Sequence, residues 1–141
     1  MSAAQTIVHR LFENATELGD APALHEKRAG AWVPTSWAGY ARLVKRAARA
    51  LMHLGFEAGD TVSILGFNRI EWVVMDLAAM AAGGAPAGIY TTCSSEEVAY
   101  IVRHSEARVV LVENAAQWAK LEPKLAEFPR LVRVVLMRDA E

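Results

Sequence analysis

A single cysteine, Cys93, is present, so no disulfide can form within the 141-residue chain, as is usual in a reducing compartment. Neither sign of charge is in excess. Fifteen lysines and arginines stand against sixteen aspartates and glutamates, which argues against a nucleic-acid-binding surface. The most apolar stretch, residues 72–82, is far shorter than the roughly 20 residues that span a bilayer, and residues 1–5 lack the pattern of a secretory signal. We therefore expect a cytoplasmic protein.

What is present is the composition of a folded globular protein. Apolar residues make up 53% of the chain and charged residues 22%. The length suits about one domain and is enough to enclose a hydrophobic core. The four histidines lie far apart, without the paired spacing of metal ligands, so the sequence predicts no metal site.

Signals for helices and strands alternate along the chain, with short connections between them. Helices are predicted after Thr6, over 37–54, 70–82, 94–104 and 114–121, the last resuming after Pro123. Strands are predicted over 61–65, 85–89, 108–112 and 131–137, with a hairpin formed by 23–26 and 32–36. This order predicts an α/β fold: a mostly parallel, doubly wound sheet with helices on both faces and an amino-terminal β-hairpin.

Single residues make local predictions within this scheme. Asn68 and Ser94 are each followed three residues later by a glutamate, Glu71 or Glu97, which is the pattern of a capping box at a helix start. Pro34 cannot donate a backbone hydrogen bond, and this places the hairpin at a sheet edge.

Three stretches, in this order, carry a family resemblance: TSWAGY (35–40) leading into a basic-faced helix, GDTVSILGFNRIEW (59–72), and MAAGGAPAGIYTT (80–92) before an acidic helix start. They resemble the motifs of the AMP-forming acyl-CoA synthetases, which are adenylate-forming enzymes. The tail, with HSEA (104–107) and VEN (112–114), looks most like the long-chain fatty acyl-CoA ligases. The resemblance spans residues 6–137, nearly the whole chain.

The resemblance implies a fragment of a larger ligase. Residues 1–141 would form part of the amino-terminal AMP-binding domain, with the carboxy-terminal domain absent. Enzymes of this family use ATP and Mg²⁺ to activate a fatty acid as an acyl-adenylate, and CoA thiol then displaces AMP. Their phosphate loop, adenine and ribose site and carboxy-terminal lysine lie downstream. We therefore expect no catalytic, cofactor-binding or metal residue in this chain, and no activity from it alone.

One loop has the position of a phosphate-binding loop. Residues 90–95 (YTTCSS) follow a strand and open a helix, where phosphate-binding loops occur. The loop contains no glycine and no lysine follows it, while Glu96 and Glu97 in the first helical turn would repel an anion. We interpret it as a capping loop. A third interpretation is that it borders the acyl or nucleotide cleft of the complete enzyme, because open α/β sheets bind ligands at the carboxyl ends of their strands.

Other polar residues have both a structural and a functional interpretation. We read Cys93 as an inert thiol rather than a nucleophile. Asp76 stands among apolar neighbours in its helix, and we expect its carboxylate to hydrogen-bond a backbone group or an arginine rather than to act in catalysis. Four basic residues recur at helical spacing and indicate a solvated face, with CoA phosphates or an anionic membrane as the alternative partner: Arg42, Lys45, Arg46 and Arg49.

Two alternatives to the fatty acyl-CoA ligase stay open: another adenylate-forming enzyme, such as an aryl-CoA ligase or a peptide-synthetase adenylation domain, and a stand-alone, non-enzymatic α/β interaction module. The reading frame beyond Glu141 separates them. A fragment would leave the apolar helix 70–82 and the strand 131–137 without their usual neighbours, so we expect it to self-associate. Contact with a membrane periphery is a further expectation for the parent protein.

Overall fold

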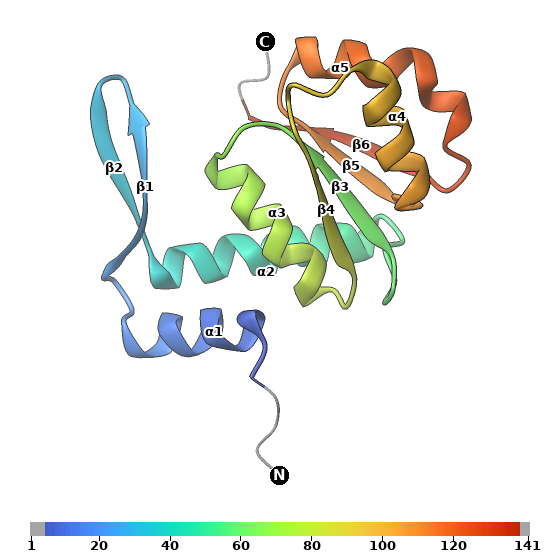
Figure 1. Cartoon of the computed structure of the whole chain (residues 1–141). Coiled ribbons are helices and arrows are strands. Elements are labelled where there is room, and N and C mark those ends of the chain that lie inside the picture. Colours follow the sequence, from blue (N-terminus) through green and yellow to red (C-terminus); the bar gives the residue numbers. More distant parts are fainter. Residues whose placement is uncertain (1–4, 139–141) are drawn as a thin grey trace.

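The computed structural model describes residues 5–138 (Figure 1). Its helices and strands alternate in the predicted order. They are α1 (Ile7–Glu17), β1 (Pro22–Arg28), β2 (Ala31–Ser36), α2 (Trp37–His53), β3 (Thr61–Leu65), α3 (Ile70–Ala81), β4 (Ala85–Ile89), α4 (Ser95–His104), β5 (Val109–Val112), α5 (Ala115–Leu121), the 3-10 helix η1 (Glu122–Glu127) and β6 (Arg133–Leu136). The chain after α5 thus tightens into a 3-10 turn that contains Pro123, instead of resuming as an α-helix.

The main sheet has four strands in the order β4-β3-β5-β6, and all three pairings are parallel. Every residue of β5 is buried, as its continuous apolar sequence predicted. β4 lies at one edge, a position that tolerates Pro86 because an edge strand has one side without a ladder to complete. The predicted doubly wound α/β architecture is confirmed.

Two hydrophobic clusters lie on opposite faces of the sheet, because side chains alternate along each strand. Val62 and Ile64 of β3 join one cluster with residues of α1, α2 and α3. Val110 and Val112 of β5 join the other with residues of α4 and α5. Figure 1 shows the corresponding arrangement, with α1, α2 and α3 together and α4 and α5 on the opposite side of the strands.

The hairpin stands apart from this body (Figure 1). β1 and β2 form a separate antiparallel sheet, in which Pro34 pairs with His25. Pro34 therefore does lie in an edge strand, but of a two-stranded sheet rather than of the main one. The turn between the strands contains Ala29 and Gly30, both with positive φ.

The two predicted capping boxes have different outcomes. Ser94 and Glu97 form theirs in full, because each side chain accepts from the other residue's backbone nitrogen. The prediction at Asn68 is wrong: α3 begins at Ile70 as predicted, but its N-cap is Arg69, with no side-chain capping bond. Glu71 is instead drawn to cations, with Oε1 at 3.3 Å from Arg138 and Oε2 at 3.5 Å from Arg69.

Candidate functional site

A cleft lies where β3 and β4 end at their carboxyl termini. It has a volume of about 410 Å³, and its walls are the loop after β3, the loop after β4 and the first turns of α3. Carboxyl ends of parallel strands are where open α/β sheets bind ligands. The residues that line the cleft share the absence of charge; they are Gly66, Phe67, Asn68, Trp72, Gly88, Ile89, Tyr90, Thr91 and Thr92.

Aromatic rings and glycines form much of the lining of this cleft. Phe67 and Tyr90 are 62% and 82% exposed, so each presents most of its ring to whatever enters. Gly88 borders the ring of Trp72, and a Cβ at Gly88 would stand only 3.1 Å from that ring. The cleft therefore combines aromatic rings and glycine backbone with the uncharged polar side chains of Asn68, Thr91 and Thr92. A lining without charge is compatible with an apolar ligand.

Several polar backbone groups of the loop after β4 form hydrogen bonds within the protein. The backbone nitrogen of Cys93 donates to the carbonyl of Tyr90 at 3.0 Å, and that of Ser94 donates to Glu97 Oε2 at 2.8 Å. This bond from the Ser94 backbone, followed by the one from its hydroxyl, lowers the pKa of Glu97. Lys120 reaches the loop from α5, where its Nζ donates to the carbonyl oxygens of Thr91 and Cys93 at 2.6 and 2.8 Å.

These bonds leave the loop unsuited to a triphosphate. The nitrogens of Cys93 and Ser94, which could have faced an anion, are already bonded to oxygens of the protein. The cation beside the loop, Lys120, contacts two carbonyls. The loop after β4 therefore does not fit the phosphates of ATP. Across residues 5–138, no group of three or more His, Cys, Asp or Glu side chains could hold a metal ion.

The loop after β3 is held from the other side. Glu113 directly follows β5 and is only 8% exposed; its Oε2 accepts from the backbone nitrogen of Phe67 at 2.8 Å. Its Oε1 lies 3.8 Å from Arg69 Nη1. Gly66 fits tightly here, since a Cβ at Gly66 would come within 3.0 Å of the Glu113 Cβ. The sequence predicted no role for Glu113 or for Lys120.

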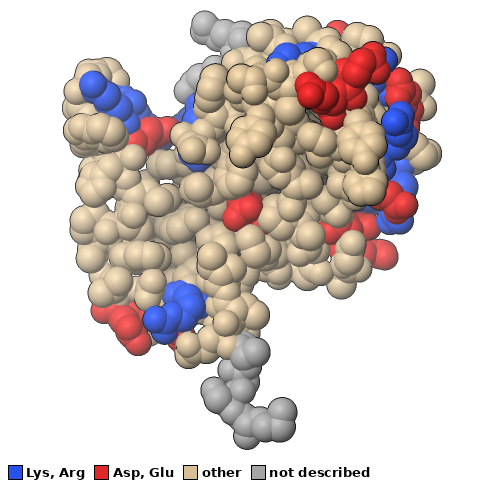
Figure 2. Space-filling view, in the orientation of Figure 1, with Lys and Arg blue, Asp and Glu red and all other residues tan. Residues whose placement is uncertain are grey.

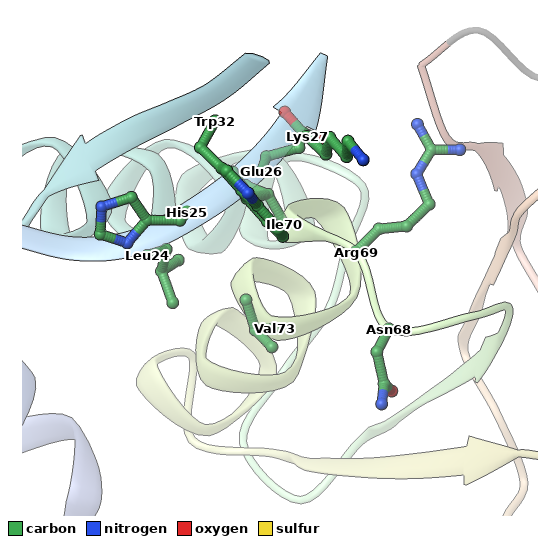
Figure 3. A pocket seen from close by; sticks show the side chains of 9 residues that line it. All are labelled: Leu24, His25, Glu26, Lys27, Trp32, Asn68, Arg69, Ile70 and Val73. Atoms are coloured by element: carbon green, nitrogen blue, oxygen red, sulfur yellow. The ribbon is translucent and has the colours of Figure 1, made fainter. Parts of the chain in front are cut away.

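A second, larger cavity of about 660 Å³ lies between the hairpin and the start of α3 (Figure 3). Leu24 and Trp32 contribute from the hairpin, and Ile70 and Val73 from α3. Its other walls carry charge, including Glu26, Lys27 and Arg69. It lies away from the end of β4, so the smaller cleft is the better candidate for a site built on the sheet.

Asp76 has a different environment from the one predicted. No hydrogen bond or ion pair to its carboxylate occurs among residues 5–138, and burial raises its pKa. It lies near Tyr40, whose hydroxyl donates to the Val73 carbonyl at 3.4 Å. Burial, and then the charge of Asp76, raises the pKa of Tyr40 to about 12.

The remaining candidates from the sequence are scattered. Cys93 is half-buried in the loop after β4. The four basic residues of α2 are exposed on its outer side, as predicted, and Lys45 lies 4.9 Å from the centre of the Phe12 ring. In the described part of the chain, no helix is both long and apolar enough to cross a bilayer.

Comparison with known proteins agrees with this architecture. The sequence profile of the family described as AMP-binding enzyme matches residues 11–141. The long-chain-fatty-acid–CoA ligase ACSBG2 of Xenopus laevis is 36% identical over 133 residues, which are 94% of this chain and 18% of that ligase. ACSBG1 of Homo sapiens, also a long-chain-fatty-acid–CoA ligase, is 37% identical with the same coverage.

Solved structures give the same answer for the fold. The N-terminal domain of FACL13 from Mycobacterium tuberculosis superposes with a TM-score of 0.85 at 22% identity, covering 97% of this chain and 36% of that one. The chain thus spans less than a fifth of the length of the curated relatives, yet the family match extends over most of its residues. The chain belongs to the AMP-binding enzyme family.

Proposed function

We propose that this chain forms part of an acid–thiol ligase that joins a long-chain fatty acid to CoA with ATP and Mg²⁺. The relatives that it resembles over 94% of its length are long-chain-fatty-acid–CoA ligases. Because it covers only 18% of those relatives, its own share of the work is a local one. We assign it the role of a scaffold that supplies one wall of the acyl site.

The observation that carries this role is the uncharged lining of the cleft. None of its nine lining residues bears a charge, and Phe67, Trp72 and Tyr90 offer aromatic faces to a hydrocarbon chain. Burial of apolar carbon against such a surface contributes about 25 cal/mol per Å² removed from water. The cleft thereby binds and orients the acyl chain and excludes water from it.

We expect activation of the carboxylate to depend on groups from other parts of the ligase. In the loop after β4, the carbonyls of Thr91 and Cys93 accept from Lys120, and the nitrogens of Cys93 and Ser94 donate to Tyr90 and Glu97. ATP, Mg²⁺ and CoA would therefore be bound by other parts of the ligase. We place the protein in fatty acid metabolism in the cytoplasm.

A related adenylating enzyme for an aryl acid and a non-enzymatic module are the competing functions. Both are tested on the protein at the full length that its gene encodes. We expect ATP-dependent acyl-CoA formation with hexadecanoate and little with benzoate. We also expect no pyrophosphate exchange from the 141 residues alone. A preference for benzoate would favour an aryl-CoA ligase, whereas no ligation of any acid, with ATP and CoA present, would favour the module.

Partners are a second part of the proposal. Figure 2 shows a broad surface with few charged side chains over α2, α3 and β4, while charge gathers over α4 and α5. Trp72, Val73 and Met75 of α3 are only half-buried. At the other edge of the sheet, Leu136 of β6 is 56% exposed. We propose that these two apolar surfaces make the isolated chain self-associate.

A further inference from the structure

Both loops that border the cleft are fastened by one short segment, residues 113–120, which runs from the end of β5 through most of α5. Glu113, at its start, holds the loop after β3 through the Phe67 nitrogen at 2.8 Å. Lys120, in the last turn of α5, holds the loop after β4 through the carbonyls of Thr91 and Cys93 at 2.6 and 2.8 Å. The two walls of the cleft are thus tied to a common element.

Neither side chain is needed to form that element. Asn114 caps α5, with its Oδ1 accepting from the Gln117 nitrogen at 3.0 Å. The carboxylate of Glu113 and the ammonium of Lys120 instead form hydrogen bonds with backbone groups 46 and 29 residues away in sequence. Hydrogen bonds from or to an ionised group are about twice as strong as neutral ones, and stronger still where water is partly excluded. These bonds therefore hold the two loops in position and are not part of what forms α5.

The position of these loops decides how wide the cleft is. Phe67 follows Gly66 on one wall, and Tyr90 precedes Thr91 on the other, so each fastened backbone group lies within one residue of a ring or hydroxyl that lines the cleft. A shift of either loop would move its lining residues with it. Width matters to an acyl chain, because a straight chain is narrower than a branched or cyclic one.

We propose that Glu113 and Lys120 are positioning residues that set the width of the cleft and so select straight acyl chains over wider ones. This inference rests on the proposed function, since it needs the cleft to hold the acyl chain. It assigns to residues 113–120 a role in specificity that their place at the end of β5 and in α5 does not itself require. Loss of either bond widens the cleft and admits a bulkier substrate.

The test compares two acids with the same number of carbon atoms, dodecanoate and 6-cyclohexylhexanoate, in the protein at the full length that its gene encodes. We expect the wild type to prefer dodecanoate in kcat/KM by about tenfold or more, the range that shape gives in an apolar pocket. Glu113→Ala and Lys120→Met should each reduce this ratio by about fivefold. The conservative variants Glu113→Gln and Lys120→Arg keep the acceptor and the donors, and should stay within about twofold of wild type.

Matched controls separate positioning from stability. Lys124→Met removes a lysine of η1 that pairs with Glu96 and Glu127, and Glu106→Gln removes an exposed carboxylate that pairs with Arg130; neither touches the cleft. A purely structural loss lowers kcat/KM for both acids together and leaves the ratio unchanged. Should Glu113→Ala fail to fold, Lys120→Met, at a half-buried site, still decides the matter.

The outcomes are distinct. An unchanged ratio in folded Lys120→Met, or an equal fall with Lys124→Met, overturns the positioning role and leaves the proposed function standing. A wild type that ligates neither acid, with ATP and CoA present, overturns the proposed function, and the inference falls with it. Amide hydrogen exchange at Phe67 and Ser94, faster in Glu113→Ala and Lys120→Met respectively, confirms that each loop was released.

Discussion

Asp60 and Arg130 are 70 residues apart in sequence, yet Asp60 Oδ1 accepts from Arg130 Nη2 at 3.0 Å. The other carboxylate oxygen accepts from the Glu57 nitrogen at 2.9 Å and lies 3.9 Å from Arg108 Nε. Asp60 is 9% exposed, directly before β3. Asp60 therefore joins three segments at the amino-terminal end of the sheet, opposite the cleft. This gives the aspartate of the GD motif a structural role.

Replacing this carboxylate should cost stability without touching the cleft. For Asp60→Ala we expect a loss of about 1–3 kcal/mol in the free energy of unfolding, because the Glu57 nitrogen and Arg130 lose their acceptor. Urea denaturation measures the loss. Glu106→Gln is the matched control: this carboxylate also bonds Arg130, but it is exposed and should contribute below about 1 kcal/mol. Equal effects in the two variants would contradict the account.

Gly84 should tolerate no side chain. A Cβ there would collide with the carbonyl oxygen of Asp60 and stand 2.5 Å from the Phe56 ring, so Gly84→Ala forces the backbone to shift. We expect a loss of about 1–3 kcal/mol, the usual range for overpacking, measured as a lower thermal midpoint. Gly88→Ala serves as comparison, because its Cβ would meet only the Trp72 ring, at 3.1 Å. A larger loss at Gly88 than at Gly84 would refute this ranking.

Tyr40 makes stability depend on pH in the alkaline range. Its pKa is raised from 10.0 to about 12, first by burial and then by Asp76. Between these values the unfolded chain has released the proton while the folded chain keeps it. The contribution is therefore complete below pH 10 and is lost as the pH rises through 12. Urea denaturation at pH 9, 10 and 11 should show this decline, and Tyr40→Phe should flatten it; the same slope in both proteins would rule out Tyr40 as its cause.

Self-association of the isolated chain follows from the apolar surface over α3. Sedimentation velocity at rising concentration should show dimers or larger species, and a hydrophobic dye should bind. Val73→Lys, which adds charge to α3, should shift the equilibrium toward monomer, whereas Ala116→Lys on the exposed side of α5 should not. A clean monomer at high concentration that binds no dye would contradict the proposal.

Local sequence patterns predicted most of the helices and strands, because capping residues, turn residues and hydrophobic periodicity act over only a few residues. The Ser94 box is an example: within residues 5–138 the Glu97 carboxylate bonds Ser94, its neighbour in sequence, so the motif forms as the sequence indicates. Asn68 carries the same pattern but forms no capping box, because Glu71 pairs with Arg69 and Arg138 and the N-cap is Arg69. Arg138 lies far along the chain, so the sequence around Asn68 cannot predict this contact.

The candidate site was predictable in place but not in detail. A loop at the carboxyl end of a strand is a general site for ligands. The sequence offered a cleft border as a third interpretation of residues 90–95, beside the favoured capping loop. The fastening residues, Glu113 and Lys120, act across 46 and 29 residues, so their partners emerge only from the fold. A polar residue directly after a buried strand, as Glu113 is after Val112, was the one available signal.

The central claim is that the cleft between the loops after β3 and β4 holds the acyl chain and not ATP. Photolabelling of the full-length protein tests it most directly, with a fatty acid carrying a diazirine near its methyl end and, separately, with 8-azido-ATP. The account predicts fatty acid label within residues 66–72 or 88–92 and azido-ATP label elsewhere. Azido-ATP label at residues 90–97, with no fatty acid label in the cleft, would contradict it.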